Sequence, residues 1–295
     1  MSRTPRTLAP GSTLARGYQV VEHLSRGRAL DVYDVWSTER ECRCVAKVLR
    51  PDRLRDASAR RRLEREGRLL RRLTHPHVVR GYDLLLAPRV AVIMETLTGE
   101  TLAHLLERGA ERLRPAEIGQ LGLQLCSAIG YLHRHGVLHL DLKPSNIVAE
   151  AGRAKLIDLS VARPPGPGPA GVGTWCYMAP EQARDGTLEP AADVWGIGVV
   201  LWEAATGRPA FGGDEDEAGA SATDTESELT PDRYPQLLRR ARPVRAHRRL
   251  PPGLARAIDT ALRPTPAERP TVPELAASLA QVSGVVSPRS PRPAS

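Results

Sequence analysis

Apolar and polar residues alternate in short runs over the first part of the chain and follow longer helical periods after it. Alternation with a period of two predicts half-buried strands at 18–24, 31–36, 44–49, 78–86 and 90–95. A turn at Gly27 separates the first two strands. Between residues 57 and 73 leucines fall on one helical stripe and arginines fill the other positions, which predicts an amphipathic helix. His75-Pro76 ends it, because the residue before a proline avoids the helical conformation.

After residue 97 the helical period dominates. The predicted helices span 102–108, 115–135, 181–184, 192–206, 234–240, 254–262 and 272–282. The pattern therefore predicts the α+β fold class. A small antiparallel β lobe at 18–96 carries one main helix, and a larger, mainly α lobe occupies 97–283.

Three segments show neither period. Residues 1–17 are rich in proline, threonine and arginine, and we expect a flexible N-terminus there. Residues 212–230 are acidic with small side chains and predict a disordered insert, and residues 284–295 predict a disordered tail. The insert is interpreted as a solvated loop, and docking onto the basic segment 239–249 is the alternative.

The formal charge of +8 changes this picture little, because the arginines are spread along the chain. Clusters at 60–72 and 239–249 are interpreted as solvated helix faces; with no aromatic residues interleaved for stacking, no nucleic-acid partner is expected. The four cysteines lack zinc-ligand spacing. The most apolar window, 194–206, is too short to span a membrane, and no signal-peptide pattern is present. We therefore expect a cytoplasmic protein without a membrane span.

The segment 137–147 carries the strongest chemical signal. It holds Asn146, which is the only asparagine of the sequence, and Lys143, which is one of three lysines. A chain that has nearly abandoned both residue types keeps them here, which indicates that the chemistry requires them. Asp141, Lys143 and Asn146 can bring a carboxylate, an ammonium and an amide to one phosphate-and-metal site.

Seven motifs in compatible order carry a resemblance to a known family. They lie at 44–49, 92–97, 139–146, 155–160, 173–181, 193–198 and 266–271. Over residues 18–282 the chain resembles a eukaryotic-type serine/threonine protein kinase, and its Arg-, Ala- and Pro-rich composition is similar to that of actinobacterial members. The resemblance implies a bilobal protein-kinase fold that binds ATP and Mg²⁺ in the cleft between its lobes. It also implies transfer of the γ-phosphate to Ser or Thr hydroxyls of protein substrates.

The resemblance assigns catalytic roles to four residues. Lys47 and Glu66 would form an ion pair that holds the α- and β-phosphates of ATP. Asp141 would accept or orient the proton of the substrate hydroxyl. Lys143 would neutralise the transferring phosphoryl group, and its place two residues after the aspartate matches Ser/Thr kinases rather than Tyr kinases.

Cofactor contacts are implied in the same way. Asn146 and Asp158 would be the Mg²⁺ ligands, since this hard cation prefers oxygen. The remaining nucleotide contacts would come from Leu24, Val32 and Val45 around the adenine ring, Met94 as gatekeeper, the backbone of Glu95 and Leu97, and Gly27 in the phosphate-covering loop.

Three further motifs carry protein-kinase identity, because small-molecule phosphotransferases that share the lobes usually lack them. By resemblance, Thr174 would contact the catalytic aspartate and lysine, and Glu181 would pair with Arg269. Asp193 would cap the backbone amides of the catalytic loop.

The phosphate-covering loop departs from the family pattern. Only Gly27 remains of three expected glycines, with Ser25 and Leu30 at the other two positions. Glycine there allows positive φ and close backbone approach to phosphate, so nucleotide affinity could suffer.

Two later departures concern regulation. Leu140 replaces the arginine that receives an activation-loop phosphate in the family, and 161–173 contains no Ser or Thr. We therefore expect activity that does not depend on phosphorylation of that stretch. Leu159-Ser160 replaces Phe-Gly, which predicts a less mobile segment.

The leading interpretation is an active kinase, because the four catalytic positions and the two Mg²⁺-ligand positions all hold residue types that match the family. The alternative is a pseudokinase or nucleotide-binding signalling scaffold, which the degraded glycine loop favours. A small-molecule phosphotransferase is the third interpretation, and the motifs of Glu181 and Asp193 disfavour it because such enzymes usually lack them. Members of the family can dimerise, so a homodimer stays open beside a monomer.

Overall fold

The computed structural model describes residues 6–109, 112–184, 186–212 and 234–283. The chain divides into two compact units. Unit 1 is Met1–Gly99 with Lys155–Val161, and unit 2 is Glu100–Ala154 with Ala162–Ser295. The predicted tail at 284–295, and the predicted insert apart from Gly212, lie outside the described residues.

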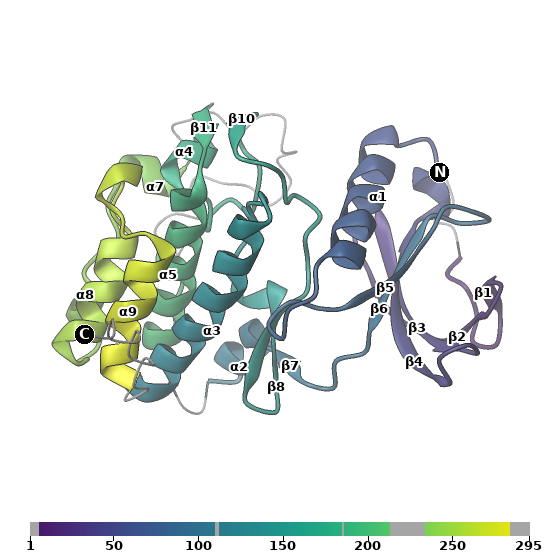
Figure 1. Cartoon of the computed structure of the whole chain (residues 1–295), viewed down its shortest axis with the longest axis horizontal. Helices are drawn as coiled ribbons and strands as arrows, with labels where there is room; N and C mark the ends of the chain where they lie inside the picture. The colour runs from purple at the N-terminus through teal and green to yellow at the C-terminus, as the bar shows by residue number, and fades with distance from the viewer. Residues whose placement is uncertain (1–5, 110–111, 185, 213–233, 284–295) are drawn as a thin grey trace, which may run out of the picture. The chain divides into compact units, whose positions relative to one another are not determined.

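Unit 1 contains a six-stranded sheet in the order β1-β2-β3-β4-β6-β5 and one main helix (Figure 1). Each neighbouring pair of strands is antiparallel. The elements are β1 (Thr13–Ala15), β2 (Tyr18–Arg26), β3 (Leu30–Ser37), β4 (Cys42–Leu49), α1 (Ala57–Arg72), β5 (Gly81–Leu85) and β6 (Ala91–Glu95). The strand and helix expectations for this part of the chain are confirmed, with small shifts at the ends.

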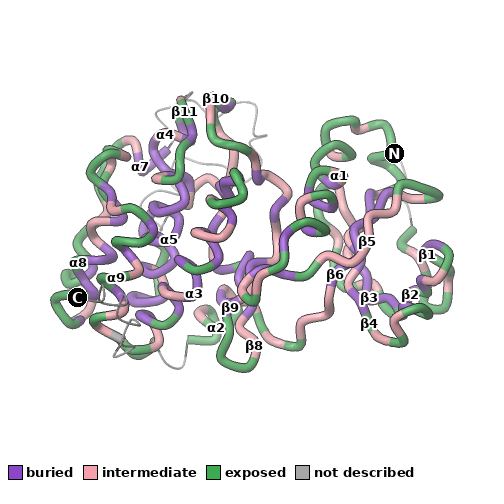
Figure 2. The backbone as a smooth tube through the Cα atoms, viewed as in Figure 1, coloured by how far each residue is buried: buried purple, intermediate pink, exposed green. Residues whose placement is uncertain are grey.

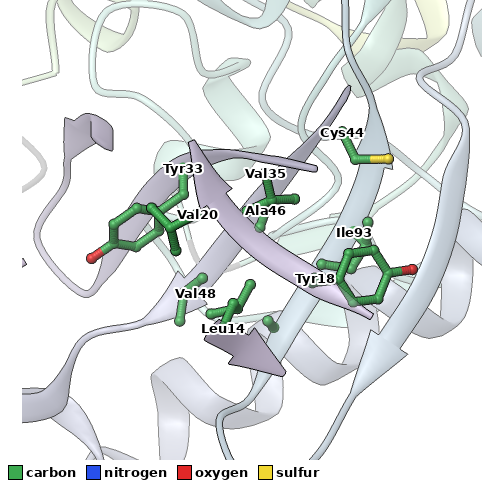
Figure 3. Packing of buried hydrophobic residues seen from close by; sticks show 10 residues of the cluster. Leu14, Tyr18, Val20, Tyr33, Val35, Cys44, Ala46, Val48 and Ile93 are labelled. Carbon is green, nitrogen blue, oxygen red and sulfur yellow. The ribbon is translucent and has the colours of Figure 1, made fainter. Parts of the chain in front are cut away.

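Alternation along the strands separates the core of unit 1 from its opposite face. Tyr33 and Val35 of β3 and Ala46 of β4 point into a cluster of buried side chains (Figure 3). Successive side chains of a strand point to opposite faces, so Lys47 lies on the face away from this cluster. The pairing of Val32 with Lys47 places Val32 on that second face as well.

β1 corrects the expectation that the chain lacks regular structure before residue 18. Thr13 and Ala15 pair with β2, and Leu14 is buried in the core of the sheet. The backbone N–H of Leu8 donates a hydrogen bond of 3.1 Å to the Tyr33 hydroxyl. The polar composition of the segment obscured its one buried side chain, Leu14, which anchors the edge strand beside the neighbouring strand of the sheet.

Helix α1 is fixed at its start and along its buried stripe. The side chain of Asp56 accepts a hydrogen bond of 2.9 Å from the backbone N–H of Ala59, which satisfies one free donor of the first turn. Leu63, Glu66 and Leu70 are buried on the stripe that faces the sheet. A Cβ on Gly67 would lie 2.8 Å from Leu84 and 2.9 Å from Val92, so glycine permits the close approach of helix and sheet.

Unit 2 is mainly helical (Figure 1). Helix α3 packs against α5 and α9, and α8 packs against the same two helices. The helices among its described residues are α2 (Leu102–Glu107), α3 (Pro115–Arg134), α4 (Pro180–Ala183), α5 (Pro190–Thr206), α7 (Pro235–Leu238), α8 (Pro252–Ala261) and α9 (Val272–Ser283). Its short strands include β7 (Glu100–Thr101), β8 (Ile147–Glu150), β10 (Gly166–Gly168) and β11 (Gly186–Leu188). Strand β9 (Arg153–Leu156) begins in unit 2 and ends in the unit 1 segment Lys155–Val161.

Helix α5 forms the centre of unit 2. It is buried over nearly its whole length, whereas α1 shows an exposed side (Figure 2). It ends at Gly207, whose φ of 74° suits glycine and whose N–H bonds the carbonyl of Glu203 at 2.7 Å. The predicted helix at 234–240 is shorter than expected, and the β10–β11 ladder was not predicted.

Candidate active site

Lys47 lies at the centre of a charged cluster in unit 1. Its Nζ is 2.7 Å from Oε1 of Glu66 on α1 and 3.4 Å from Oδ2 of Asp158. The ammonium also donates a hydrogen bond of 3.3 Å to the carbonyl of Ile157. Within unit 1 the structure therefore brings together three residues that the sequence places far apart. The ion pair expected between Lys47 and Glu66 is present.

Burial and charge act in opposite directions on this pair. Burial raises the pKa of Glu66, and the neighbouring ammonium of Lys47 offsets part of that effect. Burial alone would lower the pKa of Lys47, but Glu66 and Asp158 hold it above its ordinary value. Lys47 therefore stays charged at neutral pH.

The segment that carries Asp158 is anchored to α1. The backbone N–H of Leu159 donates to Oε1 of Glu66 at 3.3 Å, and Leu159 itself is buried. The N–H of Ser160 donates to Oδ1 of Asp158 at 2.7 Å, and Arg65 donates to the Ser160 carbonyl at 2.9 Å. These bonds hold the Asp158 carboxylate in place without the Phe-Gly sequence of the family.

The residues expected around adenine keep apolar surface accessible. Val32 and Val45 are partly buried on the face of the sheet that carries Lys47, and Leu24 is 50% exposed. Met94 is buried and pairs in register with Val45. Val32 and Val45 therefore share one face of the sheet with the Lys47 ammonium, and small-molecule sites combine apolar residues with a few charged groups in this way.

Three side chains hold the β2–β3 turn, where the resemblance expects the phosphate-covering loop. Arg26 donates to both carboxylate oxygens of Asp31 across the β2–β3 hairpin, at 2.7 and 2.9 Å. Arg50 donates to the Gly27 carbonyl at 2.8 Å. Burial would raise the pKa of Asp31, but the hydrogen bonds from Arg26 and His23 hold it below its ordinary value. Arg26 is therefore paired within the hairpin rather than solvated.

Sequence reasoning missed an ion pair at the end of β6. Nζ of Lys155 lies 2.5 Å from Oε1 of Glu95, and the same oxygen accepts the backbone N–H of Arg80 at 2.8 Å. Lysine rarity was the available signal, because Lys155 is the third of the three lysines. The pair fixes the Glu95 side chain, and the backbone N–H of Glu95 donates to the Arg80 carbonyl at 3.0 Å.

In unit 2 the catalytic loop forms a second polar cluster around Asp141. Oδ2 of Asp141 accepts a hydrogen bond of 3.0 Å from the Asn146 amide and lies 3.1 Å from Nζ of Lys143. Oδ1 accepts a hydrogen bond of 2.6 Å from the Thr174 hydroxyl. Nζ of Lys143 donates to the same hydroxyl at 2.5 Å. The predicted contacts of Thr174 with both residues are present.

Asp193 on α5 fixes the backbone before this cluster. Its Oδ2 accepts the N–H of His139 at 2.9 Å and its Oδ1 accepts the N–H of Leu140 at 2.7 Å, so the predicted cap is present. His133, which sequence reasoning did not single out, lies 2.8 Å from Oδ2 through its Nε2. Burial would raise the pKa of Asp193, but His133, His139 and the N–H of Leu140 hold it below its ordinary value.

The pair of Glu181 and Arg269 is present and fully enclosed on the arginine side. Two parallel hydrogen bonds of 2.6 and 2.8 Å join the guanidinium to the carboxylate. The exposed fraction of the Arg269 side chain is 0%, and the guanidinium lies 5.0 Å from the centre of the Trp195 ring. The pair joins α4 to the segment before α9 and stabilises unit 2.

Few side chains of the described residues are grouped as metal ligands. Among the described residues, no group of three or more His, Cys, Asp or Glu side chains could hold a metal ion. The amide nitrogen of Asn146 donates hydrogen bonds to the backbone carbonyl and to Oδ2 of Asp141. The amide oxygen of Asn146 is therefore the atom suited to a cation. Carboxylate and amide oxygens are both atom types that Mg²⁺ accepts as ligands, and the ion usually completes its shell with phosphate and water.

None of the helices in the described part of the chain is long and apolar enough to cross a membrane.

Comparison with known proteins places this geometry in a family. The protein kinase domain family matches residues 18–279. Serine/threonine-protein kinase PknB of Mycolicibacterium smegmatis is 30% identical over 293 residues, which cover 95% of this chain and 45% of that protein. Serine/threonine-protein kinase PknB of Mycobacterium tuberculosis is 32% identical over 216 residues, covering 69% of this chain and 34% of that protein. The chain thus spans less than half the length of these relatives.

The crystal structure of the Mycobacterium tuberculosis PknI kinase domain superimposes with a TM-score of 0.70 and 25% identity, over 93% of this chain and 99% of that one. The match confirms the predicted fold class, with an antiparallel β unit and a mainly helical unit. The PknB relatives confirm the resemblance to bacterial serine/threonine kinases. On the family match, the relatives and the fold together, the chain belongs to the protein kinase domain family.

Proposed function

We propose that this chain is an ATP-dependent protein kinase that transfers the γ-phosphoryl group to serine and threonine hydroxyls of proteins. The observation that carries the proposal is the pairing of Asp141 and Lys143 around one hydroxyl. The Thr174 hydroxyl donates to the carboxylate of Asp141 and accepts from the ammonium of Lys143. A substrate hydroxyl needs the same two partners, one for its proton and one for the charge on the phosphoryl group.

Each residue then has one task. Asp141 orients the attacking hydroxyl and takes its proton, and Lys143 offsets the negative charge of the transferring group. Lys47, held charged by Glu66, contacts the α- and β-phosphates. Asn146 and Asp158 would hold Mg²⁺, which would neutralise phosphate charge when bound. In the family these groups act on one nucleotide, and we propose the same for this chain. Leu24, Gly27, Val32, Val45, Met94, Glu95 and Leu97 would form the rest of the nucleotide site.

We further propose that activity is independent of phosphorylation between residues 161 and 173. Leu140 cannot bind a phosphate, and this stretch offers no Ser or Thr to receive one. Phosphosite mapping of active protein tests the idea. Activation that tracks a phosphate on this stretch would refute it.

Substrates and setting are part of the same proposal. We propose protein substrates in the cytoplasm and no nucleic-acid partner. Light scattering of the purified protein separates a monomer from the homodimer that the family resemblance also allows.

The central experiment is phosphoryl transfer from labelled ATP with Mg²⁺, by wild type, Asp141→Asn and Lys47→Met. Wild type is expected to label serine or threonine on itself or on a basic protein. Both variants are expected to lose at least about a hundredfold, because an electrostatic contact of the transition state is removed.

A matched control is Lys155→Met. It also breaks a partly buried lysine–carboxylate pair of unit 1, but it has no proposed contact with phosphate. It should therefore keep transfer. Folded wild type that binds ATP yet labels nothing would refute the proposal and support the scaffold alternative.

A further inference from the structure

Leu140, which lies in the catalytic loop, has an unusual backbone conformation. Its φ is 65°, in the left-handed region that residues with a Cβ seldom occupy, and its side chain is buried. Such a conformation persists only when its surroundings hold it. Asp193 holds the N–H of Leu140, as described above. The carbonyl of Leu140 needs a second partner.

That partner is Gln182 on α4. Its Nε2 donates one hydrogen bond to the Leu140 carbonyl and another to the Val172 carbonyl, both at 2.8 Å. Its Oε1 accepts the N–H of Ala179 at 3.0 Å, and its backbone carbonyl accepts the N–H of Gly171 at 2.8 Å. Gln182 is 2% exposed, so water does not compete for these bonds.

Gly173 shows how closely the two segments approach at this point. Its φ is 126°, and a Cβ there would lie 2.7 Å from the Leu140 carbonyl oxygen and 3.2 Å from Nε2 of Gln182. The next residue is Thr174, whose hydroxyl bonds Asp141 and Lys143. The side-chain amide of Gln182 therefore bonds the backbone two residues before Thr174, which itself contacts the catalytic aspartate.

We infer that Gln182 is a positioning residue whose amide N–H groups hold the catalytic loop against residues 171–174 in place of a phosphate. This inference rests on the kinase function proposed above and explains how the site is ordered without an arginine at position 140. The neutral amide joins two carbonyls directly, so the ordered state needs no modification.

The matched pair of variants Gln182→Glu and Gln182→Leu separates this role from simple support of α4. A carboxylate keeps the acceptor for the Ala179 N–H but cannot donate to either carbonyl. At neutral pH we expect kcat to fall about tenfold or more in both variants, as for loss of buried hydrogen bonds. KM for ATP should stay within about twofold, because the Lys47 cluster belongs to unit 1.

The pH profile provides the signature of donation. Burial beside two carbonyls raises the pKa of the introduced carboxyl, so it takes up a proton as the pH falls and can donate again. The ratio of Gln182→Glu activity to wild-type activity should therefore rise towards lower pH, and the Gln182→Leu ratio should not. A flat ratio for Gln182→Glu, or wild-type kcat in Gln182→Leu, would overturn the inference.

A control and a readout without catalysis complete the test. Gln124 is another buried glutamine of unit 2, bonded to the Gly152 carbonyl and the Ala154 N–H, so Gln124→Glu should lower stability without the pH signature. Amide hydrogen exchange of residues 139–142 and 171–174 should quicken in Gln182→Glu and not in Gln124→Glu.

Exchange also separates the two proposals. If wild type transfers no phosphate, the kinase proposal fails, and faster exchange in Gln182→Glu still supports the positioning role. If wild type is active and exchange is unchanged in Gln182→Glu, the positioning role fails alone. Gly173→Ala forces the two segments apart and should quicken amide exchange in the same residues. Exchange as slow as in the wild type in Gly173→Ala would also count against the inference.

Discussion

Replacing Glu181 by alanine tests how unit 2 is held together. Arg269 has five N–H groups, and each has an acceptor in the structure. The acceptors are both oxygens of Glu181 and the carbonyls of Arg263, Ala191 and Pro264. Without the carboxylate, a charged group with 0% exposure keeps only carbonyl partners.

Removing one partner of a buried ion pair costs about 3–5 kcal/mol, because the remaining charge is left uncompensated. For a unit of this size each kcal/mol shifts Tm by about 2–4 °C, so Glu181→Ala should lower Tm by roughly 6–20 °C. Arg269→Met should cost a similar amount. The Glu181→Met/Arg269→Met double variant should cost less than the sum of the single variants, because no unpaired charge remains.

Tryptophan fluorescence during thermal or urea unfolding follows this unit, since Trp175, Trp195 and Trp202 lie in unit 2. The control is Arg108→Ala, which breaks an exposed ion pair with Glu100 in the same unit and should cost at most about 1 kcal/mol. If Glu181→Ala cost no more than this control, the enclosed pair would not stabilise unit 2, and the reasoning would be refuted.

Two more predictions concern the other charged contacts. The pKa of Asp193 is lower in the folded protein than its ordinary value of 3.8. Its ionised form therefore stabilises the folded state fully at pH values above 3.8, and this contribution is lost as the pH falls through the lower pKa of the folded state. The stability difference between wild type and Asp193→Asn, from urea midpoints, should therefore shrink at acid pH, and a difference that grew there would contradict the assignment. Arg26→Ala removes the bidentate partner of Asp31, so amide exchange in residues 25–30 should quicken and the Kd for ATP should rise about threefold to tenfold; an unchanged Kd would show that the pair does not shape the phosphate turn.

The sequence predicted the parts of the candidate site that lie close together along the chain. Asp141, Lys143 and Asn146 fall within one loop, and their rarity and spacing pointed to phosphate chemistry. Periodicity found α1 and most strands, because burial of one face leaves a regular imprint on the residues of a single element. The family resemblance then supplied partners for Lys47 and Asp193, and the expected contacts are present.

Contacts of residues without a known motif were beyond the sequence. Nothing in the local pattern marked Gln182, which follows Glu181 on a short helix, or joined Lys155 to Glu95. The composition before residue 18 concealed β1, because this edge strand depends on pairing with β2 and on one buried side chain, Leu14, rather than on a repeating pattern of its own.

Residue types, their order and their local periods fixed which chemical groups this protein carries and which elements hold them. Only the tertiary structure decided which groups meet: the amide of Gln182 with the Leu140 carbonyl, or Arg26 with Asp31. The physical reason is that burial makes a polar group bond whatever donor or acceptor the packing brings to it, and packing depends on the whole unit rather than on neighbours in sequence.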